Sequence, residues 1–154
     1  MSASHWSGPG MFGPNKDAGD PNAPYNQGTV HLTQYVNISF DADLVAEQVI
    51  YLPPGARITS FNCDVLTAFN SATSATLSAG ITSGGTEYMS GVNVKAATGR
   101  IAPTYTAAQL AAMSSQSVLG VAAPIPGQVY LTVTSVGQPT AGYITVAVNY
   151  AQNP

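Results

Sequence analysis

The clearest strand pattern in the chain is QVYLTVTSV, residues 128–136, followed by YITVAVNY, residues 143–150. In both stretches an apolar residue stands at nearly every second position, with polar or small residues between them. This period of two predicts β-strands with one buried face. Residues 137–140, GQPT, lie between the two stretches and favour a loop. We therefore predict that the two strands form a C-terminal β-hairpin.

Five earlier stretches alternate in the same way or are rich in β-branched and aromatic residues. They are Val30 to Phe40, Gln48 to Leu52, Arg57 to Phe69, Ala75 to Thr82 and Glu87 to Val94. The turn-forming sequences PPG, residues 53–55, and SGGT, residues 83–86, separate some of them. A short helix is predicted over residues 107–113, because Thr106 and Gln109 have the spacing of a capping box.

This series of short strands with Gly and Pro turns predicts an all-β protein. A jelly roll, which places eight strands in two sheets, fits the series best. We expect a jelly-roll-like β-sandwich of about eight strands with one short helix and an extended N-terminal arm. The chain of 154 residues has the length of a single domain.

Charge is scarce in this sequence. Asp, Glu, Lys and Arg make up only 7% of the residues, against about 25% in an ordinary soluble domain. A free monomer uses surface charge to stay soluble, so the shortage favours a protein that packs against neighbouring subunits. Secreted and surface-layer proteins can share this composition. The basic residues Lys16, Arg57, Lys95 and Arg100 are scattered, which argues against nucleic-acid binding.

Several other functional classes find no support in the sequence. The single cysteine, Cys63, excludes an intramolecular disulfide and a cysteine zinc cluster, and its apolar strand context predicts a small core residue. No apolar run is long enough for a transmembrane helix, so we expect no membrane partner. The first residues lack the pattern of a secretory signal.

The first 27 residues differ from the rest of the chain, since they are rich in Gly and Pro and show no strand or helix period. We predict an arm over residues 1–27 and a β-sandwich domain over residues 28–154. Ordering the arm would cost on the order of 1–2 kcal/mol per residue. An ordered arm needs contacts that offset this cost, so we expect it to lie on a surface. That surface is its own domain, a sister subunit or a host lattice. The predicted partner-binding anchors are Trp6, Met11, Phe12 and Tyr25.

Catalytic and metal-binding patterns are weak. The two histidines, His5 and His31, have no nucleophile-elbow motif to accompany them, so we expect His31 to face solvent or an interface. Asp41 and Asp43 flank a turn, but two carboxylates fall short of the six to eight oxygens that calcium requires. Capping of the turn explains them as well. We predict no enzyme activity, no catalytic residues, no metal and no cofactor.

Four stretches resemble small virion proteins of tailed phages. They are VIYLPPGARI at 49–58, DVLTAFN at 64–70, ATLSAG at 75–80 and TAGYITVAVNY at 140–150. In that family a Leu-Pro-x-Gly type of turn precedes a long strand, and an Ala-Gly hairpin leads to the last strand. The resemblance covers about residues 48–150 and implies a jelly-roll decoration (cement) protein. Such a protein docks on the outside of a phage capsid.

From this resemblance we expect a structural protein that binds the major capsid protein and stabilises the shell across capsomer joints. Self-association as a homodimer or homotrimer and a location on the outer capsid surface are implied as well. The main alternative is a receptor- or glycan-binding module of a head fibre or tail, which would use tyrosines and polar loops. A jelly-roll enzyme and a bacterial surface or pilus subunit are less well supported.

Overall fold

The computed structural model describes residues 30–41, 45–53, 55–115 and 127–152, which form eight strands and one helix. The elements are β1 (Val30–Ser39), β2 (Val45–Leu52), β3 (Arg57–Thr67), β4 (Ser74–Gly80), β5 (Met89–Asn93), β6 (Gly99–Ile101), α1 (Ala107–Ser115), β7 (Gly127–Val136) and β8 (Tyr143–Gln152). The predicted arm over residues 1–27 and its boundary with the domain lie outside the described residues.

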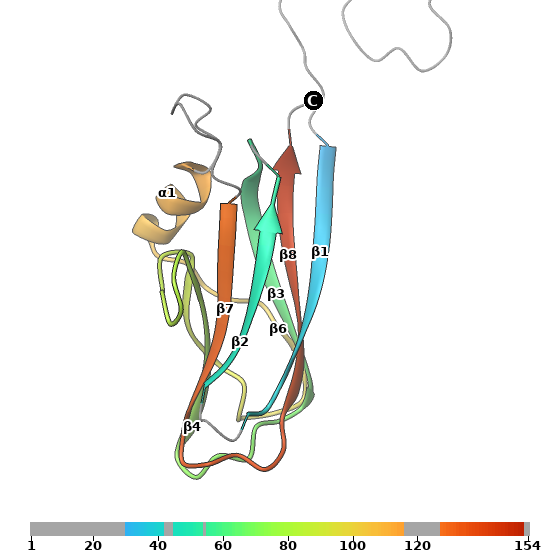
Figure 1. Ribbon diagram of the computed structural model, residues 1–154, viewed down its shortest axis with the longest axis vertical. Helices are drawn as coiled ribbons and strands as arrows, with labels where there is room; N and C mark the ends of the chain where they lie inside the picture. Colours follow the sequence, from blue (N-terminus) through green and yellow to red (C-terminus); the bar gives the residue numbers. More distant parts are fainter. Residues whose placement is uncertain (1–29, 42–44, 54, 116–126, 153–154) are drawn as a thin grey trace, which may run out of the picture.

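The strands form two four-stranded antiparallel sheets (Figure 1). One has the order β1-β8-β3-β6 and is called sheet A; the other has the order β2-β7-β4-β5 and is called sheet B. The pairs β1/β8, β2/β7, β3/β6 and β4/β5 make a nested hairpin. This hairpin is rolled up so that β8 also pairs with β3, and β7 with β4. The order is that of a jelly roll, so the predicted fold class is confirmed.

The core lies between the two sheets and is built by the alternation visible in the sequence. In β8, for example, Ile144, Val146 and Val148 are fully buried, whereas Thr145 and Asn149 are partly exposed. Sheet B supplies the opposing layer from the inner faces of all four strands. Its fully buried side chains include Leu52, Ala75, Leu77, Ala79, Met89, Val129, Leu131 and Val133.

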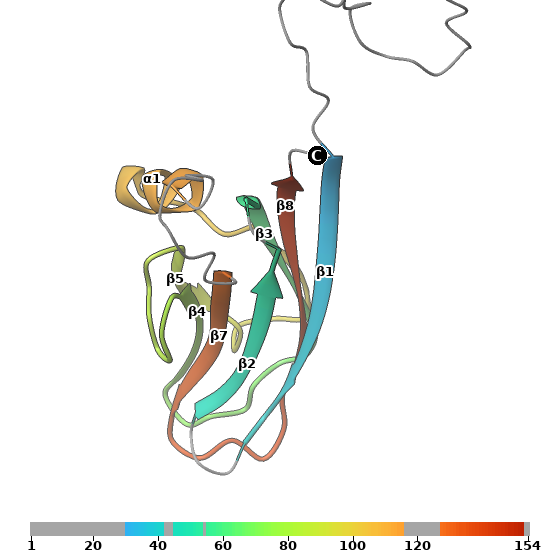
Figure 2. The same ribbon diagram turned by 45° about the horizontal axis from the view of Figure 1, so that its top comes forward.

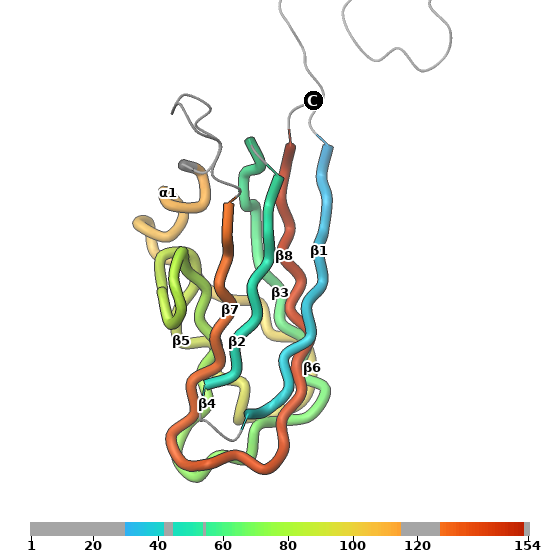
Figure 3. Tube along the Cα trace, viewed as in Figure 1, coloured from blue at the N-terminus to red at the C-terminus, as the bar shows by residue number. Residues whose placement is uncertain are grey.

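The predicted C-terminal hairpin is wrong, because β7 and β8 belong to different sheets. β7 pairs with β2 and β4, and β8 pairs with β1 and β3. Both strands bury one face in the same core, from opposite sides, so both show the same alternation. Alternation reports burial of one face and carries no information on the partner strand. Figure 3 shows the chain leaving β7 and crossing to β8 at one end of the sandwich.

Asn70 fixes this crossing. Its side-chain oxygen accepts hydrogen bonds from the backbone N–H groups of Thr140 (2.8 Å) and Ala141 (3.0 Å). Its side-chain nitrogen donates to the Thr140 hydroxyl at 2.8 Å. Next to it, Gly142 lies against the Phe69 ring, where a Cβ atom would come within 2.5 Å of Cγ. The connection therefore packs too closely on Phe69 for a larger residue.

Helix α1 contacts β3 and lies at the other end of the sandwich, close to β5 (Figure 2). The predicted capping box is present: the Thr106 N–H donates to Gln109 Oε1 (2.9 Å), and the Gln109 N–H donates to Thr106 Oγ1 (3.2 Å). The Gln109 amide also donates to Thr86 O and Ser90 Oγ, each at 3.1 Å. This side chain therefore joins the helix to the β4–β5 connection and to β5.

The strand boundaries differ from the predicted ones mainly at short elements. β2 begins three residues earlier than predicted, at Val45, and β5 is shorter, Met89–Asn93. The three residues of β6, GRI, were not predicted as a strand, because one apolar residue in three shows no period. At the other extreme, β1 pairs with β8 along its whole length, from Val30 opposite Gln152 to Ser39 opposite Tyr143.

Candidate functional site

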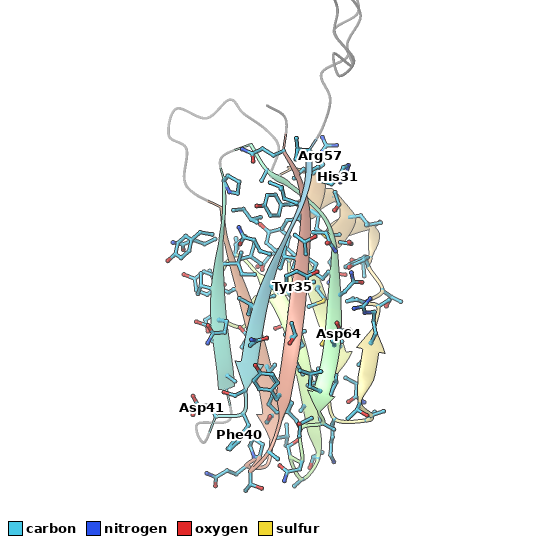
Figure 4. The ribbon with its side chains drawn as sticks, turned by 90° about the vertical axis from the view of Figure 1, so that its right-hand side faces the viewer. His31, Tyr35, Phe40, Asp41, Arg57 and Asp64 are labelled. Carbon is cyan, nitrogen blue, oxygen red and sulfur yellow. The ribbon has the colours of Figure 1, made fainter. Side chains whose placement is uncertain are left out.

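The predicted partner-binding residues Trp6, Met11, Phe12 and Tyr25 lie outside the described residues, as does Asp43. His31 is exposed at the start of β1, and Asp41 is exposed just after its end (Figure 4). Within the described ranges, no three His, Cys, Asp or Glu side chains gather in a way that could hold a metal ion.

Strand β1 is an edge strand of unusual character. It stands first in sheet A, so its outer edge has no strand partner among the described residues. Its ten residues pair with β8 without a register shift, whereas strands in general average about five or six residues. It contains no Lys, Arg, Pro, Asp or Glu. Proteins usually protect such edges with charges, prolines, bulges or short strands, and β1 has none of these.

The opposite side of the sandwich shows the usual protection. The edge strands there are β5, with five residues, and β6, with three. Lys95 follows β5 closely and Arg100 lies on β6, so two cations stand near these edges. The long, uncharged edge of β1 therefore lacks the features that protect the two edges on the opposite side.

Exposed hydrophobic side chains gather on the same side. Six of the ten large hydrophobic residues that are exposed in the described part of the chain lie between residues 30 and 51. They are Val30, Leu32, Tyr35, Phe40, Val45 and Tyr51. Strands β1 and β2 contact each other across the sandwich and lie next to each other in Figure 4. We call this surface, formed by residues 30–40 and 45–52, the β1–β2 edge.

On the outer face of sheet A, neutral polar side chains form cross-strand hydrogen bonds. Thr33 Oγ1 donates to Asn149 Oδ1 at 2.7 Å, and Asn149 Nδ2 donates to Ser60 Oγ at 3.0 Å. Four positions along β1, Thr145 Oγ1 donates to Asn37 Oδ1 at 2.8 Å. Among the described residues, the side-chain nitrogen of Asn37 has no hydrogen-bond acceptor.

The ion pair on this face lies away from the β1–β2 edge, on β3 and β6. Arg100 Nε donates to Asp64 Oδ1 at 2.7 Å, and Arg100 Nη2 donates to Asp64 Oδ2 at 2.8 Å. The hydrogen bond from Arg100 lowers the pKa of Asp64, and the same bond raises the pKa of Arg100. Because both side chains are partly exposed to solvent, the pair contributes little to stability.

A shallow depression of about 350 Å³ lies beside α1, lined by Thr86, Glu87, Thr106, Ala108, Gln109 and Ala112. The polar groups of Gln109 that face it already hold the helix through the capping box and the bonds to Thr86 and Ser90. They hold the fold together and are not left free for a ligand. Across the described ranges, no helix combines the length and the apolar character needed to cross a bilayer.

Comparison with known protein families, characterised proteins and solved structures found no match to this chain. The resemblance to small phage virion proteins therefore remains a prediction based on the four sequence stretches. The absence of enzyme activity likewise stays a prediction.

Sequence reasoning missed the β1–β2 edge as a surface. The uncharged run over residues 30–40 is visible in the sequence. That run alone cannot tell an edge strand from a central one, since the strand order depends on pairing between distant residues. The central strand β8, for example, is equally free of charge.

Proposed function

We propose that this protein is a structural subunit that acts by packing against other protein subunits through its β1–β2 edge. Its specific role would be that of a decoration protein on the outside of a tailed-phage capsid. There it would bind the major capsid protein and add interface free energy across the joints between capsomers. No chemical reaction is needed for this role.

The observation that carries this proposal is the unprotected edge of β1. An edge strand with open hydrogen-bonding groups is a template for pairing with another chain, and Tyr35, 71% exposed, stands at its middle. Tyrosine is enriched at protein interfaces and charge is depleted there. The charge-poor sequence and the jelly-roll fold agree with a subunit that is permanently in contact with neighbouring subunits.

The direct test is binding to shells assembled from the major capsid protein encoded in the same genome. We expect saturable binding at hundreds of copies per shell. A double variant of the edge, Leu32→Lys with Tyr35→Lys, should weaken binding at least about tenfold, because it adds the charges that natural edges use against pairing. The matched control is Leu66→Lys with Ile81→Lys, at residues that are also exposed but lie outside the β1–β2 edge. Absence of binding, or a few copies at a single vertex, would contradict the proposal.

The N-terminal segment offers a second test of attachment. If residues 1–27 anchor the protein, their removal should weaken shell binding through loss of multivalent contact. The β-sandwich should stay folded, which circular dichroism and thermal unfolding would verify. Replacement of Trp6 and Phe12 by Ala in the full chain should produce a smaller loss in the same direction. Unchanged binding of the truncated protein would show that the arm does not contribute to attachment to the shell.

A second candidate function is glycan or receptor binding by the outer face of sheet A. The observation in its favour is the combination of exposed Tyr35 with the hydroxyl and amide groups of Thr33, Asn37 and Thr145. Aromatic rings and fixed polar groups can bind sugars. A glycan array separates the two candidates, because a decoration protein gives no specific signal on it. A strong signal abolished by Tyr35→Ala would favour the glycan-binding function.

A further inference from the structure

We infer that the partner of β1 is β1 of a second copy of this chain, paired antiparallel about a two-fold axis at Tyr35. The two A sheets would join into one continuous eight-stranded sheet. This inference rests on the first part of the proposed function, packing against other subunits through the β1–β2 edge, and names the occupant of β1. It does not depend on the second part, the decoration of a capsid.

The register follows from the two faces of the strand. Even-numbered residues of β1 face the core side, where Ile38 is buried, and odd-numbered residues face outward. Antiparallel pairing must match even with even and odd with odd, because a slip of one residue would turn every side chain to the wrong face. With Tyr35 opposite its own copy, all residues from 31 to 39 find partners. A register centred on Gln34 would pair as many residues of β1, 30–38, but only the Tyr35 register also places exposed Val30 opposite exposed Phe40.

The polar side chains are complementary in this register. Thr33 stands opposite Asn37 of the second copy, and Asn37 stands opposite the copy's Thr33. The Thr33 hydroxyl already donates its proton to Asn149, so its oxygen remains an acceptor. The Asn37 oxygen already accepts from Thr145, so its nitrogen remains a donor. Each copy can therefore donate one Asn37-to-Thr33 hydrogen bond, and the Thr–Asn pairs continue across the joint.

The apolar side chains on the other face also meet. Leu32, which is 39% exposed, stands opposite buried Ile38 of the second copy. Val30 of each copy, which is 52% exposed, stands opposite Phe40 of the other copy, which is 42% exposed. The two-fold axis makes this contact occur twice. No acidic or basic residue of β1 opposes another, so the pairing brings no like charges together.

The size of the contact indicates a weak pair. One strand of ten residues and a sheet depth of about 10 Å cover on the order of 300 Å² per partner, against about 800 Å² in a standard interface. Side chains of β2 next to β1, such as Tyr51, can add to this area. We therefore expect dissociation in the micromolar range or above, and a pair that forms fully where subunits are concentrated on a shared surface.

The test is sedimentation equilibrium of the full chain from 10 µM to 1 mM, together with variants that place a positive or a negative charge at Tyr35, on the two-fold axis. Tyr35→Lys and Tyr35→Glu should each weaken dimerisation at least about tenfold, because each places like charges directly opposite. An equimolar mixture of the two should restore dimers as mixed pairs. Leu66→Lys is the control and should dimerise like the unchanged protein. A monomeric unchanged protein at 1 mM, or unaffected dimers in both variants, would overturn the inference.

A cross-link provides a second readout of the register. Residues directly opposite in antiparallel strands have Cα atoms about 4.5–5.5 Å apart, within the range of a disulfide. Tyr35→Cys should therefore form a disulfide-linked dimer on mild oxidation, since Cys63 is buried and out of reach. Thr145→Cys, on the neighbouring strand β8, should not. Equal cross-linking of both variants would exclude this register.

The two proposals fail in different ways. A monomer that still binds capsid shells would overturn the subunit pair and leave the decoration role standing. A dimer with the Tyr35 register that binds no shell would overturn the decoration role and leave the pair standing.

Discussion

Cys63 illustrates how a single buried side chain ties stability to pH. Its side chain has no exposed surface, and burial, together with the neighbouring Asp64 carboxylate, raises its pKa to about 11. The folded state therefore holds the neutral thiol, whereas the unfolded chain loses the proton near the ordinary pKa of 9.0. This contribution to stability is fully present below pH 9 and is lost as the pH rises toward 11.

We expect the free energy of unfolding to fall by about 2–3 kcal/mol between pH 8.5 and 11 because of Cys63. Tyr105, whose pKa is also raised by burial, adds to the fall. Denaturant unfolding across this range, compared with Cys63→Ala, isolates the thiol because alanine does not titrate. The same thiol should react with a thiol reagent only on unfolding. Rapid reaction in the native protein, or identical pH profiles of the two proteins, would contradict this account.

Gly142 is constrained by space rather than by backbone conformation alone. It has a φ of 155°, and an added Cβ would lie 2.5 Å from Phe69 Cγ. Gly142→Ala should therefore cost about 2–4 kcal/mol, from overpacking and backbone strain together. Gly84→Ala is the matched control: its φ is 70°, but nothing lies within 4 Å of the added atom. Only the strain of about 1–2 kcal/mol applies there. Equal losses in the two variants, measured by denaturant unfolding, would refute the steric explanation.

At the scale of elements, a side chain continues the hydrogen bonding along the edge of β3 beyond the point where its partner strand β6 ends. β3 pairs with β6 only over Cys63 to Val65. Beyond that point the Tyr105 hydroxyl, from the link before α1, serves the same backbone edge. It accepts from the Phe61 N–H at 2.8 Å and donates to the Phe61 carbonyl at 3.2 Å. One phenol thus replaces the two hydrogen bonds that a longer β6 would make.

Tyr105→Phe should destabilise the protein by about 1–3 kcal/mol, because it leaves both backbone groups of Phe61 without this partner. Amide hydrogen exchange at Phe61 should speed up more than exchange at Val65. Tyr51→Phe is the control, since Tyr51 is 58% exposed and should lose nothing measurable. Unaltered exchange at Phe61 would show that the hydroxyl does not hold this edge.

The elements could be predicted from sequence wherever the cause is local. The capping box of Thr106 and Gln109 depends on residues three apart, and the long strands depend on a period of two. The partners of β7 and β8 could not be predicted, because they lie up to about 120 positions away in the sequence. The same holds for the β1–β2 edge: its uncharged residues are visible in sequence, but its place at the rim of sheet A is decided by the pairing of β1 with β8.

For the whole molecule, the distribution of the few charges is more informative than their number. In the described part, Lys95 and Arg100 lie on the side of β5 and β6, and strands β1 and β2 themselves carry only Glu47; Arg57 and Asp41 lie near the two ends of β1 (Figure 4). Electrostatic interactions therefore contribute little to the free energy of association through this edge. Its free energy must come from apolar contact and from strand hydrogen bonds, neither of which salt screens strongly.

Association through the edge should accordingly change less than about twofold between 50 and 500 mM sodium chloride. Sulfate should strengthen it, because strongly hydrated salts favour the burial of apolar surface. Sedimentation or shell binding over a salt series measures this, with the Tyr35→Lys and Tyr35→Glu mixture as a salt-sensitive comparison. A tenfold weakening of the unchanged protein at high salt would point to charged contacts elsewhere on the molecule.

The pairing of Val30 with Gln152 has a practical consequence. The polypeptide enters β1 and leaves β8 at the same pole of the sandwich, on neighbouring strands. A reporter enzyme or an epitope fused beyond either position would emerge from that pole and would leave the loops at the far pole unobstructed. A circular permutant that joins Gln152 directly to Val30 would need only a short linker there.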